Sequence, residues 1–418
     1  MTTLSPRPRT ARHRALPAAA ALAAIAVVTL AGCVPATSTA LPAATSSSTG
    51  PVQEDLRALV DQAVLDGIPG VVVRIDDGGE PYTLTAQADW AEVLSPDATF
   101  RVASNSKTAT AVLVLQLVDA GRISLDDTVD TWFATIPDAG TTTVRMLLNH
   151  TSGLADYALE PSVLAAIAGQ RPDLPGAAEL VQAGADATLA GEPLEGYHYS
   201  NAGYVLLGQI VEQVSGKPLS ALFDETVATP LGLTETRYAS PGDEAEVRGY
   251  EPDARGLAPL LPAGTPEGFS FAGPSASDGW VDVTAIDQSW NGPAGAMIST
   301  AAEWATFQRA LLGGELLSAR SMEDMRTTVP EGESASGPGR SYGLGLERVE
   351  TACGTVWGHD GALPGYGSDT YTDEVGGRSM TVFTTSNFGI LTQPGAVDAR
   401  TGLIEAAACA MFGDELPA

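Results

Sequence analysis

Positive charge is scarce in this chain of 418 residues, which has 22 Lys and Arg against 51 Asp and Glu and a formal net charge of −29. A surface this acidic repels phosphate backbones, which argues against a nucleic-acid partner. Only two lysines are present, Lys107 and Lys217, so a lysine that stands inside a motif is a meaningful signal.

Long apolar runs are scarce as well. One run, Ala15–Ala31, follows a positive segment from Arg7 to Arg14, and nothing beyond it is long and apolar enough to span a bilayer. This arrangement is typical of a secretory signal, which we expect over residues 1–32. The last three residues of the signal and the next residue read Leu-Ala-Gly-Cys33. This tetrapeptide resembles the bacterial lipobox, in which cleavage before the cysteine leaves it N-terminal and lipidated. An ordinary cleaved signal with a chance cysteine is the alternative.

Residues 33–52 are rich in Pro, Ser, Thr and Ala, which is typical of a flexible tether. The two segments together predict a protein that is held by lipid on the extracellular face of the cell membrane, or secreted. The lipid anchor would be its only contact with a membrane.

Cysteines are few, and two remain after Cys33, namely Cys353 and Cys409. Outside the cytoplasm two such cysteines commonly pair. We therefore expect a disulfide that ties a strand of the sheet to the C-terminal helix, with two buried free thiols as the alternative.

The rest of the composition is that of a folded chain with many loops, since 44% of residues are hydrophobic and only 17% charged, with 45 Gly and 28 Pro. Apolar spacing predicts strands near both ends and helices between them. The expected helices are Gln53–Asp66, Ser104–Ala120, Ala301–Leu312, Ser318–Arg326 and Ala396–Phe412. The expected strands are Val71–Ile75, Tyr82–Ala88, Tyr342–Glu350, Gly365–Thr372 and Ser379–Thr385.

These elements predict an α+β fold, an α/β sandwich with an all-α lobe. One antiparallel five-stranded sheet would be flanked by the N- and C-terminal helices, and a mainly helical second domain would complete it. The globular domain would span residues 53–412, with the sheet lobe at about 53–102 and 290–412 and the helical lobe at about 103–289. A cleft between two such lobes is a usual place for a functional site.

The first chemical motif is Ser104-Asn-Ser-Lys107, the only Ser-x-x-Lys in the chain. Residues three apart on a helix share a face, so the Lys107 amine can reach the Ser104 hydroxyl. Burial lowers the pKa of a lysine, and a neutral lysine can activate serine as a nucleophile. The alternative is a helix-capping serine beside a lysine that extends to solvent.

Two further motifs follow along the chain. Tyr199-Ser-Asn201 precedes an apolar helix. A tyrosine near the cationic Lys107 could have a depressed pKa and carry protons. Asn201 could orient the lysine and bond a substrate amide. In His359-Asp-Gly361, the glycine suits a backbone that approaches a ligand closely. The N–H of Ala362 could then pair with that of Ser104 as an oxyanion hole. Taken singly, each motif also fits an ordinary cap or core residue.

The order Ser-x-x-Lys, Tyr-Ser-Asn and His-x-Gly resembles that of the class C β-lactamase and D-alanyl-D-alanine carboxypeptidase family of serine hydrolases. The resemblance covers roughly residues 53–412. Further runs that match the family are Phe100–Ala103, Leu147–Leu154, Gly208–Glu212, Pro230–Leu233, Ala294–Thr300 and Tyr342–Leu346.

The resemblance implies a β-lactamase/transpeptidase-like fold and catalysis through an acyl-enzyme. Ser104 would attack a carbonyl, Lys107 and Tyr199 would handle protons, and His359 would stand where other members carry lysine. No metal and no organic cofactor is implied. The expected activity is D-alanyl-D-alanine carboxypeptidase-like, in a monomer acting on a small peptide or ester, such as a peptidoglycan stem peptide or a β-lactam. The disulfide also fits the resemblance, because carboxypeptidase members carry paired cysteines near these positions.

The chain departs from those carboxypeptidases where they hold the substrate's carboxylate. They carry His-Thr-Gly-Thr, whereas this chain has His-Asp360-Gly-Ala, and an aspartate facing an anionic terminus would be repulsive. Glu347 stands at the position of their carboxylate-binding arginine, with Arg348 beside it. Either Arg348 or His359 would have to replace that arginine. An esterase or a D-amino-acid amidase therefore stays open, as does a β-lactamase.

Two other interpretations remain. Gly339-Arg-Ser341-Tyr-Gly343 fits the G-x-S-x-G pattern of α/β-hydrolases, which requires a strand before it and a helix after it. Here a Gly/Ser/Pro loop precedes the pattern and a predicted strand follows. A lipid-anchored penicillin sensor that acylates slowly or not at all is the non-enzyme alternative.

Overall fold

The computed structural model describes residues 50–136, 138–187, 196–261, 268–332, 339–393 and 395–417. The expected signal segment, its Cys33 and most of the tether lie outside the described residues. Across the described ranges, none of the helices combines the length and the apolar character that crossing a bilayer requires.

The core of the molecule is an eight-stranded antiparallel sheet in the order β2-β1-β14-β13-β12-β11-β10-β9. The first strand of the chain pairs with the last, with Val73 opposite Val382. The strands are β1 (Gly70–Asp76), β2 (Tyr82–Gln87), β9 (Val329–Pro330), β10 (Arg340–Tyr342), β11 (Glu347–Thr351), β12 (Gly354–Leu363), β13 (Tyr366–Thr372) and β14 (Ser379–Thr384).

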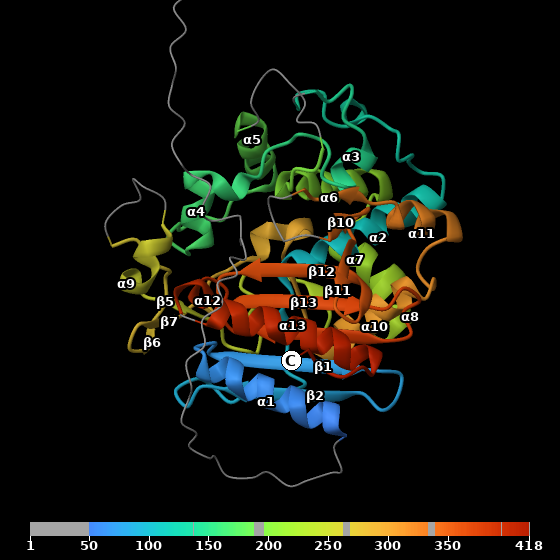
Figure 1. Ribbon diagram of the computed structural model, residues 1–418. Coiled ribbons are helices and arrows are strands. Elements are labelled where there is room, and N and C mark those ends of the chain that lie inside the picture. The colour runs from blue at the N-terminus through green and yellow to red at the C-terminus, as the bar shows by residue number, and fades with distance from the viewer. Residues whose placement is uncertain are drawn as a thin grey trace, which may run out of the picture.

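Two terminal helices, α1 (Pro51–Leu65) and α13 (Ala396–Phe412), pack side by side across one face of this sheet (Figure 1). In α1 the buried residues Leu56, Val60 and Ala63 recur at helical spacing, which produces one apolar face. Successive residues of a strand point to opposite faces of the sheet. Because β1 has apolar residues at successive positions, Val71 to Val73, both of its faces are apolar. Its Val73 packs in the cluster under the terminal helices, and Val72 packs in the larger core on the other side.

The segment between the sheet's two halves is mainly helical, and its centre is α2 (Ser106–Asp119), which is buried along almost its whole length. Helix α6 (Asn201–Ser215) packs against α2, and α10 (Ala301–Leu312) packs on β13 and β14. The remaining helices are α3 (Val144–Leu148), α4 (Pro161–Ile167), α5 (Ala177–Ala187), α7 (Leu219–Phe223), α8 (Thr229–Leu231), α9 (Ala254–Leu257), α11 (Ala319–Arg326) and α12 (Phe388–Thr392). The remaining described strands form two small three-stranded sheets, β3 (Phe100–Arg101) with β8 (Met297–Ser299) and β4 (Arg237–Tyr238), and β5 (Tyr250–Pro252) with β7 (Trp280–Asp282) and β6 (Ser275–Ser277).

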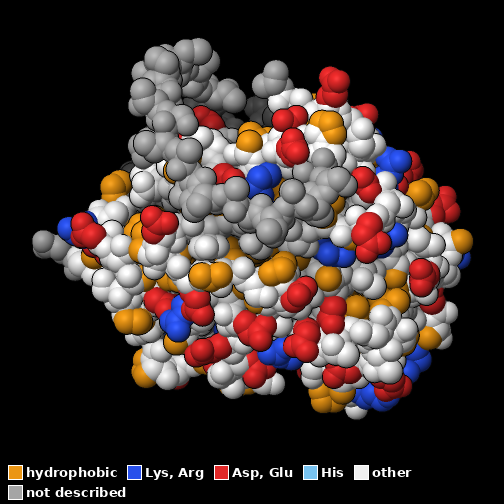
Figure 2. All heavy atoms as spheres, turned by 90° about the horizontal axis from the view of Figure 1, so that it is seen from below, with side chains coloured by type: hydrophobic (Ala, Val, Ile, Leu, Met, Phe, Trp, Pro, Cys, Tyr) orange, Lys and Arg blue, Asp and Glu red, His pale blue; other side chains and the backbone are white. Residues whose placement is uncertain are grey.

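The predicted α+β class is confirmed, but the sheet has eight strands rather than five. The expected strand Tyr342–Glu350 divides into β10 and β11 around a turn, and β12 was not predicted as a strand. The nucleophile helix begins at Ser106, because Ala103–Asn105 form a 3₁₀ turn. The surface seen from the α1 side has carboxylates spread over it, not gathered in one patch (Figure 2).

The expected disulfide joins Cys353 and Cys409. Cys353 lies in the turn between β11 and β12, and Cys409 lies in α13, so the bond fastens the sheet to the helix that covers it. It closes a loop between residues 56 apart. We expect the double variant Cys353→Ser/Cys409→Ser to lose about 2–4 kcal/mol of unfolding free energy, because the bond limits the freedom of the unfolded chain.

Urea unfolding followed by circular dichroism measures this loss. The wild-type protein unfolded in excess dithiothreitol is the control and should match the double variant. Equal urea midpoints for the oxidised wild type and the double variant would show that the disulfide contributes nothing to stability.

Candidate active site

Ser104 lies in the 3₁₀ turn that precedes α2, after a residue with an unusual backbone. Ala103 has a φ of +51°, a conformation that residues other than glycine rarely adopt. Hydrogen bonds hold this loop: Ser106 Oγ donates to Ala103 O at 2.6 Å, and Ser368 Oγ donates to Val102 O at 2.8 Å. The surrounding fold therefore positions the Ser104 hydroxyl rigidly at the start of the helix.

Lys107 is fully buried and its amine contacts Ser104 directly. Its Nζ lies 3.2 Å from Ser104 Oγ, 2.6 Å from Asn201 Oδ1 and 2.7 Å from the carbonyl oxygen of Ala294. Burial lowers the pKa of Lys107 to about 7. A neutral amine has two N–H donors, which the amide and carbonyl oxygens accept, so its lone pair is left for the Ser104 proton. This is the arrangement that a general base requires.

Tyr199 contacts both Lys107 and the Ser104 hydroxyl. Its ring centroid is 4.8 Å from Lys107 Nζ, and its side chain is hydrogen-bonded to Ser104. Burial raises the pKa of Tyr199 well above its ordinary value, so the expected depression of this pKa by Lys107 is wrong. The reason is that burial disfavours the phenolate, and at the high pH where a phenol ionises the Lys107 amine is already neutral. Tyr199 is therefore a neutral phenol, able to donate a proton.

Asn201 begins α6, whose preceding residue Ser200 caps the helix by accepting a bond from the Gly203 N–H at 3.3 Å. The Oδ1 of Asn201 accepts a hydrogen bond from Lys107. The Nδ2 of Asn201 donates to Asp156, at 3.0 Å to Oδ1 and 3.1 Å to Oδ2. Sequence reasoning missed Asp156, although it lies two residues after the matched run Leu147–Leu154. The amide of Asn201, expected to bind substrate, is thus also engaged in orienting Lys107.

His359 is fully buried on β12, and both of its ring nitrogens are used within the protein. Nδ1 lies 2.5 Å from the carbonyl oxygen of Asp360, which can only accept, and Nε2 lies 2.8 Å from the Tyr342 hydroxyl, which therefore donates. Burial lowers the pKa of His359 to about 4, so the ring is neutral at pH 7. These contacts support a structural role on the strand; the expected catalytic role remains a prediction.

Strand β12 approaches the nucleophile loop closely at Gly361. A Cβ at this position would lie 2.6 Å from the carbonyl oxygen of Val102 and 2.5 Å from Ser368 Oγ, so only glycine fits. The next residue, Ala362, is exposed. The N–H groups of Ser104 and Ala362 remain the predicted oxyanion hole.

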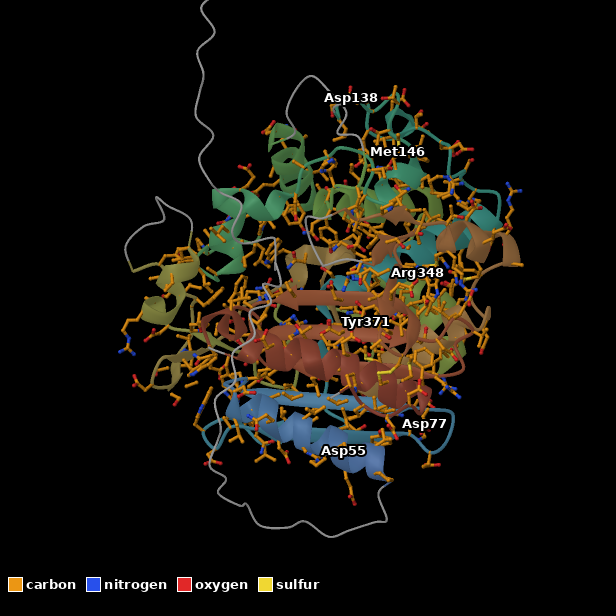
Figure 3. All side chains as sticks on the ribbon, in the orientation of Figure 1. Asp55, Asp77, Asp138, Met146, Arg348 and Tyr371 are labelled. Atoms are coloured by element: carbon orange, nitrogen blue, oxygen red, sulfur yellow. A yellow bond between two sulfur atoms is a disulfide. The ribbon has the colours of Figure 1, made fainter. Side chains whose placement is uncertain are left out.

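The arginine expected to bind a carboxylate is occupied elsewhere. Arg348 Nη2 lies 2.5 Å from Glu350 Oε1, and Arg348 lies over the Trp357 ring (Arg348 is labelled in Figure 3). A different arginine, Arg340, lies closer to the β12 motif, and it was not singled out from the sequence.

Arg340 is held by carboxylates. Its Nη2 donates to Glu347 Oε2 at 2.5 Å and to Asp360 Oδ2 at 3.2 Å, and Tyr371, labelled in Figure 3, donates to the same Glu347 oxygen at 2.8 Å. Among the described residues, Glu347, His359 and Asp360 form one group with the spacing of metal ligands. The guanidinium already lies between the two carboxylates, which disfavours a cation there.

The competing nucleophile does not fit its pattern. Ser341 lies within β10, opposite Arg348 of β11, so a strand and not a helix follows it. The strand-turn-helix setting that a nucleophile elbow requires is therefore missing at this position.

The fold and this Ser–Lys–Tyr arrangement are those of a penicillin-recognising serine hydrolase. The β-lactamase family profile matches residues 56–400, and the chain belongs to this family, as the resemblance predicted. Penicillin-binding protein 4 of Amycolatopsis lactamdurans is 27% identical over 78% of this chain and 82% of its own length. Esterase EstB of Burkholderia gladioli is 31% identical over 48% of this chain and 55% of its own length.

Two solved structures match over nearly their whole length. A D-stereospecific amidohydrolase from Streptomyces sp. is 31% identical, with a TM-score of 0.71, over 85% of this chain and 98% of its own. The D-amino acid amidase of Ochrobactrum anthropi SV3, complexed with L-phenylalanine, is 27% identical with a TM-score of 0.72, over 86% of this chain and 99% of its own. Penicillin-binding protein 4* of Bacillus subtilis, at 37% identity, is matched over only 31% of its length.

Proposed function

We propose that this serine hydrolase cleaves amides and esters of D-amino acids whose leaving group carries no carboxylate. Lys107 takes the proton of Ser104 as its oxygen attacks the carbonyl carbon, and the backbone N–H groups of Ser104 and Ala362 bond the resulting oxyanion. Tyr199 donates a proton to the leaving amine or alcohol as the bond between that group and the carbonyl carbon breaks, and Tyr199 recovers a proton from the Lys107 ammonium, so both groups return to their starting states. Water, deprotonated by the neutral Lys107, then attacks the acyl-enzyme, the Ser104 oxygen leaves with a proton returned through Tyr199, and the D-amino acid is released.

The observation that carries the proposal is the charge around β12. Arg340 is neutralised by Glu347 and Asp360, Arg348 is paired with Glu350, and His359 is uncharged at pH 7. Each cation considered for a substrate carboxylate is therefore either engaged or neutral. An anionic substrate end placed near Asp360 would instead be repelled.

A half-buried acidic residue hydrogen-bonded to Asn201 supports an amine-bearing substrate. Asp156 is linked to Lys107 through Asn201, so it lies beside the reacting atoms. A carboxylate in this position suits the protonated α-amine of an amino acid amide. The likeness to a D-stereospecific amidohydrolase and a D-amino acid amidase supports the same class of substrate.

A matched pair of substrates tests the proposal. We expect kcat/KM for acetyl-D-alanyl-D-alanine amide to exceed that for acetyl-D-alanyl-D-alanine by at least about tenfold, because the carboxylates around β12 repel a free carboxylate, and about 1.4 kcal/mol of repulsion corresponds to a tenfold change in rate. D-alanine amide should be hydrolysed, and L-alanine amide is the stereochemical control. Faster cleavage of the free acid would establish the carboxypeptidase activity instead.

The carboxypeptidase activity is the second candidate, and the match to a penicillin-binding protein over 82% of that protein's length favours it. Mass spectrometry after incubation with benzylpenicillin distinguishes the remaining members of the family. A stable adduct on Ser104 would support a carboxypeptidase or a sensor, and rapid hydrolysis of the penicillin would support a β-lactamase. An unmodified protein with intact penicillin is the outcome expected here.

We also propose that the protein acts on the extracellular side of the membrane, anchored by lipid at Cys33. The disulfide between Cys353 and Cys409 supports an oxidising compartment. Metabolic labelling with a palmitate analogue tests the anchor, and the variant Cys33→Ser should lose the label.

A further inference from the structure

His150 lies outside the catalytic groups, in the turn after α3, and its backbone is strained. Its φ is +59°, and among the described residues only Ala103, Asp138 and His150 have positive φ without being glycine. Ala103 precedes the nucleophile, so two of these three residues are near the site. Strain of this kind persists where the surrounding structure enforces it, often for function.

The contacts of His150 enclose Tyr199. Its Nδ1 accepts a hydrogen bond from the Ser200 N–H at 3.1 Å, and its carbonyl oxygen accepts one from the His198 N–H at 2.7 Å. The residues on both sides of Tyr199 are thus held by one histidine. The imidazole ring also packs on the Tyr199 ring, with 4.4 Å between the centroids.

The imidazole is neutral, and its tautomer follows from these contacts. Because Nδ1 accepts, the proton is on Nε2, which is buried without a hydrogen-bond partner among the described residues. Burial lowers the pKa of His150 well below its ordinary value, and Lys107 and His359 lower it further. The aromatic groups around the ring are Tyr197, Tyr199, Tyr204 and Tyr342. A neutral ring in this place does not repel the Lys107 ammonium.

We propose that His150 is a positioning residue for catalysis, one that sets the Tyr199 hydroxyl against Ser104 by fixing the backbone on both sides of the tyrosine. The role rests on the proposed acyl transfer through Ser104. It explains why the fold retains both a positive φ and an unpartnered ring N–H at this residue.

Three substitutions separate the contributions. In His150→Asn the amide Oδ1 occupies the place of Nδ1, and asparagine tolerates a positive φ. His150→Gly keeps the φ but has no acceptor for the Ser200 N–H. His150→Ala loses both the acceptor and the backbone tolerance.

With D-alanine amide as substrate, whose leaving amine needs a proton, we expect kcat to fall about 100-fold in His150→Gly and His150→Ala, since a misplaced group costs about that much. KM should change less than about threefold because the side chain does not touch the substrate. His150→Asn should recover most of the lost kcat. The rise of kcat/KM with pH should keep its midpoint in every variant, because Lys107 is untouched.

Circular dichroism and thermal unfolding establish which variants fold, and the Asn and Gly variants are the matched comparison if His150→Ala does not. Wild-type kcat in His150→Gly, or equal losses in the Asn and Gly variants, would overturn the positioning role. A wild-type protein inert toward D-alanine amide would overturn both this role and the proposed function. An active wild type with three equally active variants would overturn the positioning role alone.

Discussion

Substituting Ser104 by alanine is expected to lower kcat/KM for esters by at least about 10⁴-fold, because loss of a nucleophile removes the acyl-enzyme route. The remaining rate would come from the oxyanion hole and substrate binding alone. The Ser104 hydroxyl is small and only its oxygen is removed, so the fold and the melting temperature should not change.

The matched control for this variant is Ser341→Ala, which removes the other candidate nucleophile from β10. We expect Ser341→Ala to retain wild-type kcat/KM. The assignment would be reversed if Ser341→Ala were inactive while Ser104→Ala retained activity. Stopped assays with p-nitrophenyl butyrate measure both variants under the same conditions.

Replacing Lys107 by methionine is expected to lower kcat/KM about 10³-fold, within the range that general base catalysis contributes. Methionine fills the buried volume but cannot accept the Ser104 proton. The wild-type pH profile should reflect the pKa of about 7 of this lysine. Below that pH the amine is protonated and has no lone pair, so kcat/KM should rise about tenfold per pH unit and level off above pH 7.

The chain offers one control for this substitution, because its only other lysine is Lys217. Lys217 is exposed and paired with Glu225 far from the site. We expect Lys217→Met to retain both the rate and the pH profile. A rising limb that persists near pH 7 in Lys107→Met would assign the titration to another group.

Most of the fold could be predicted because its elements carry strong local patterns. Helices α1, α10 and α13 and strands β1, β2 and β14 show clear apolar spacing, and all lie close to their predicted bounds. Strand β12 was missed because three glycines, His359 and Asp360 interrupt its apolar pattern. Those glycines have a tertiary cause: a Cβ at Gly358 would lie 1.9 Å from the carbonyl oxygen of Thr370 on β13. Such an approach is invisible until the neighbouring strand is known.

The candidate site divides in the same way. Ser104, Lys107, Tyr199 and Asn201 belong to short motifs, and the structure brings all four together. The charge around β12 could not be inferred, because it depends on ion pairs between residues on different strands. Arg340 meets Asp360 only through the stacking of β10, β11 and β12.

The pairing of β1 with β14 has a consequence for the timing of synthesis. A ribosome that adds about 5–20 residues per second needs about 15–60 s to travel from the first of these strands to the last. During that interval β1 has no partner on one edge, and β12, which carries Ala362 of the predicted oxyanion hole, emerges only near the end. The nascent chain therefore carries an unassembled nucleophile for most of its synthesis, and hydrolytic activity cannot begin before β12 and β14 have been made.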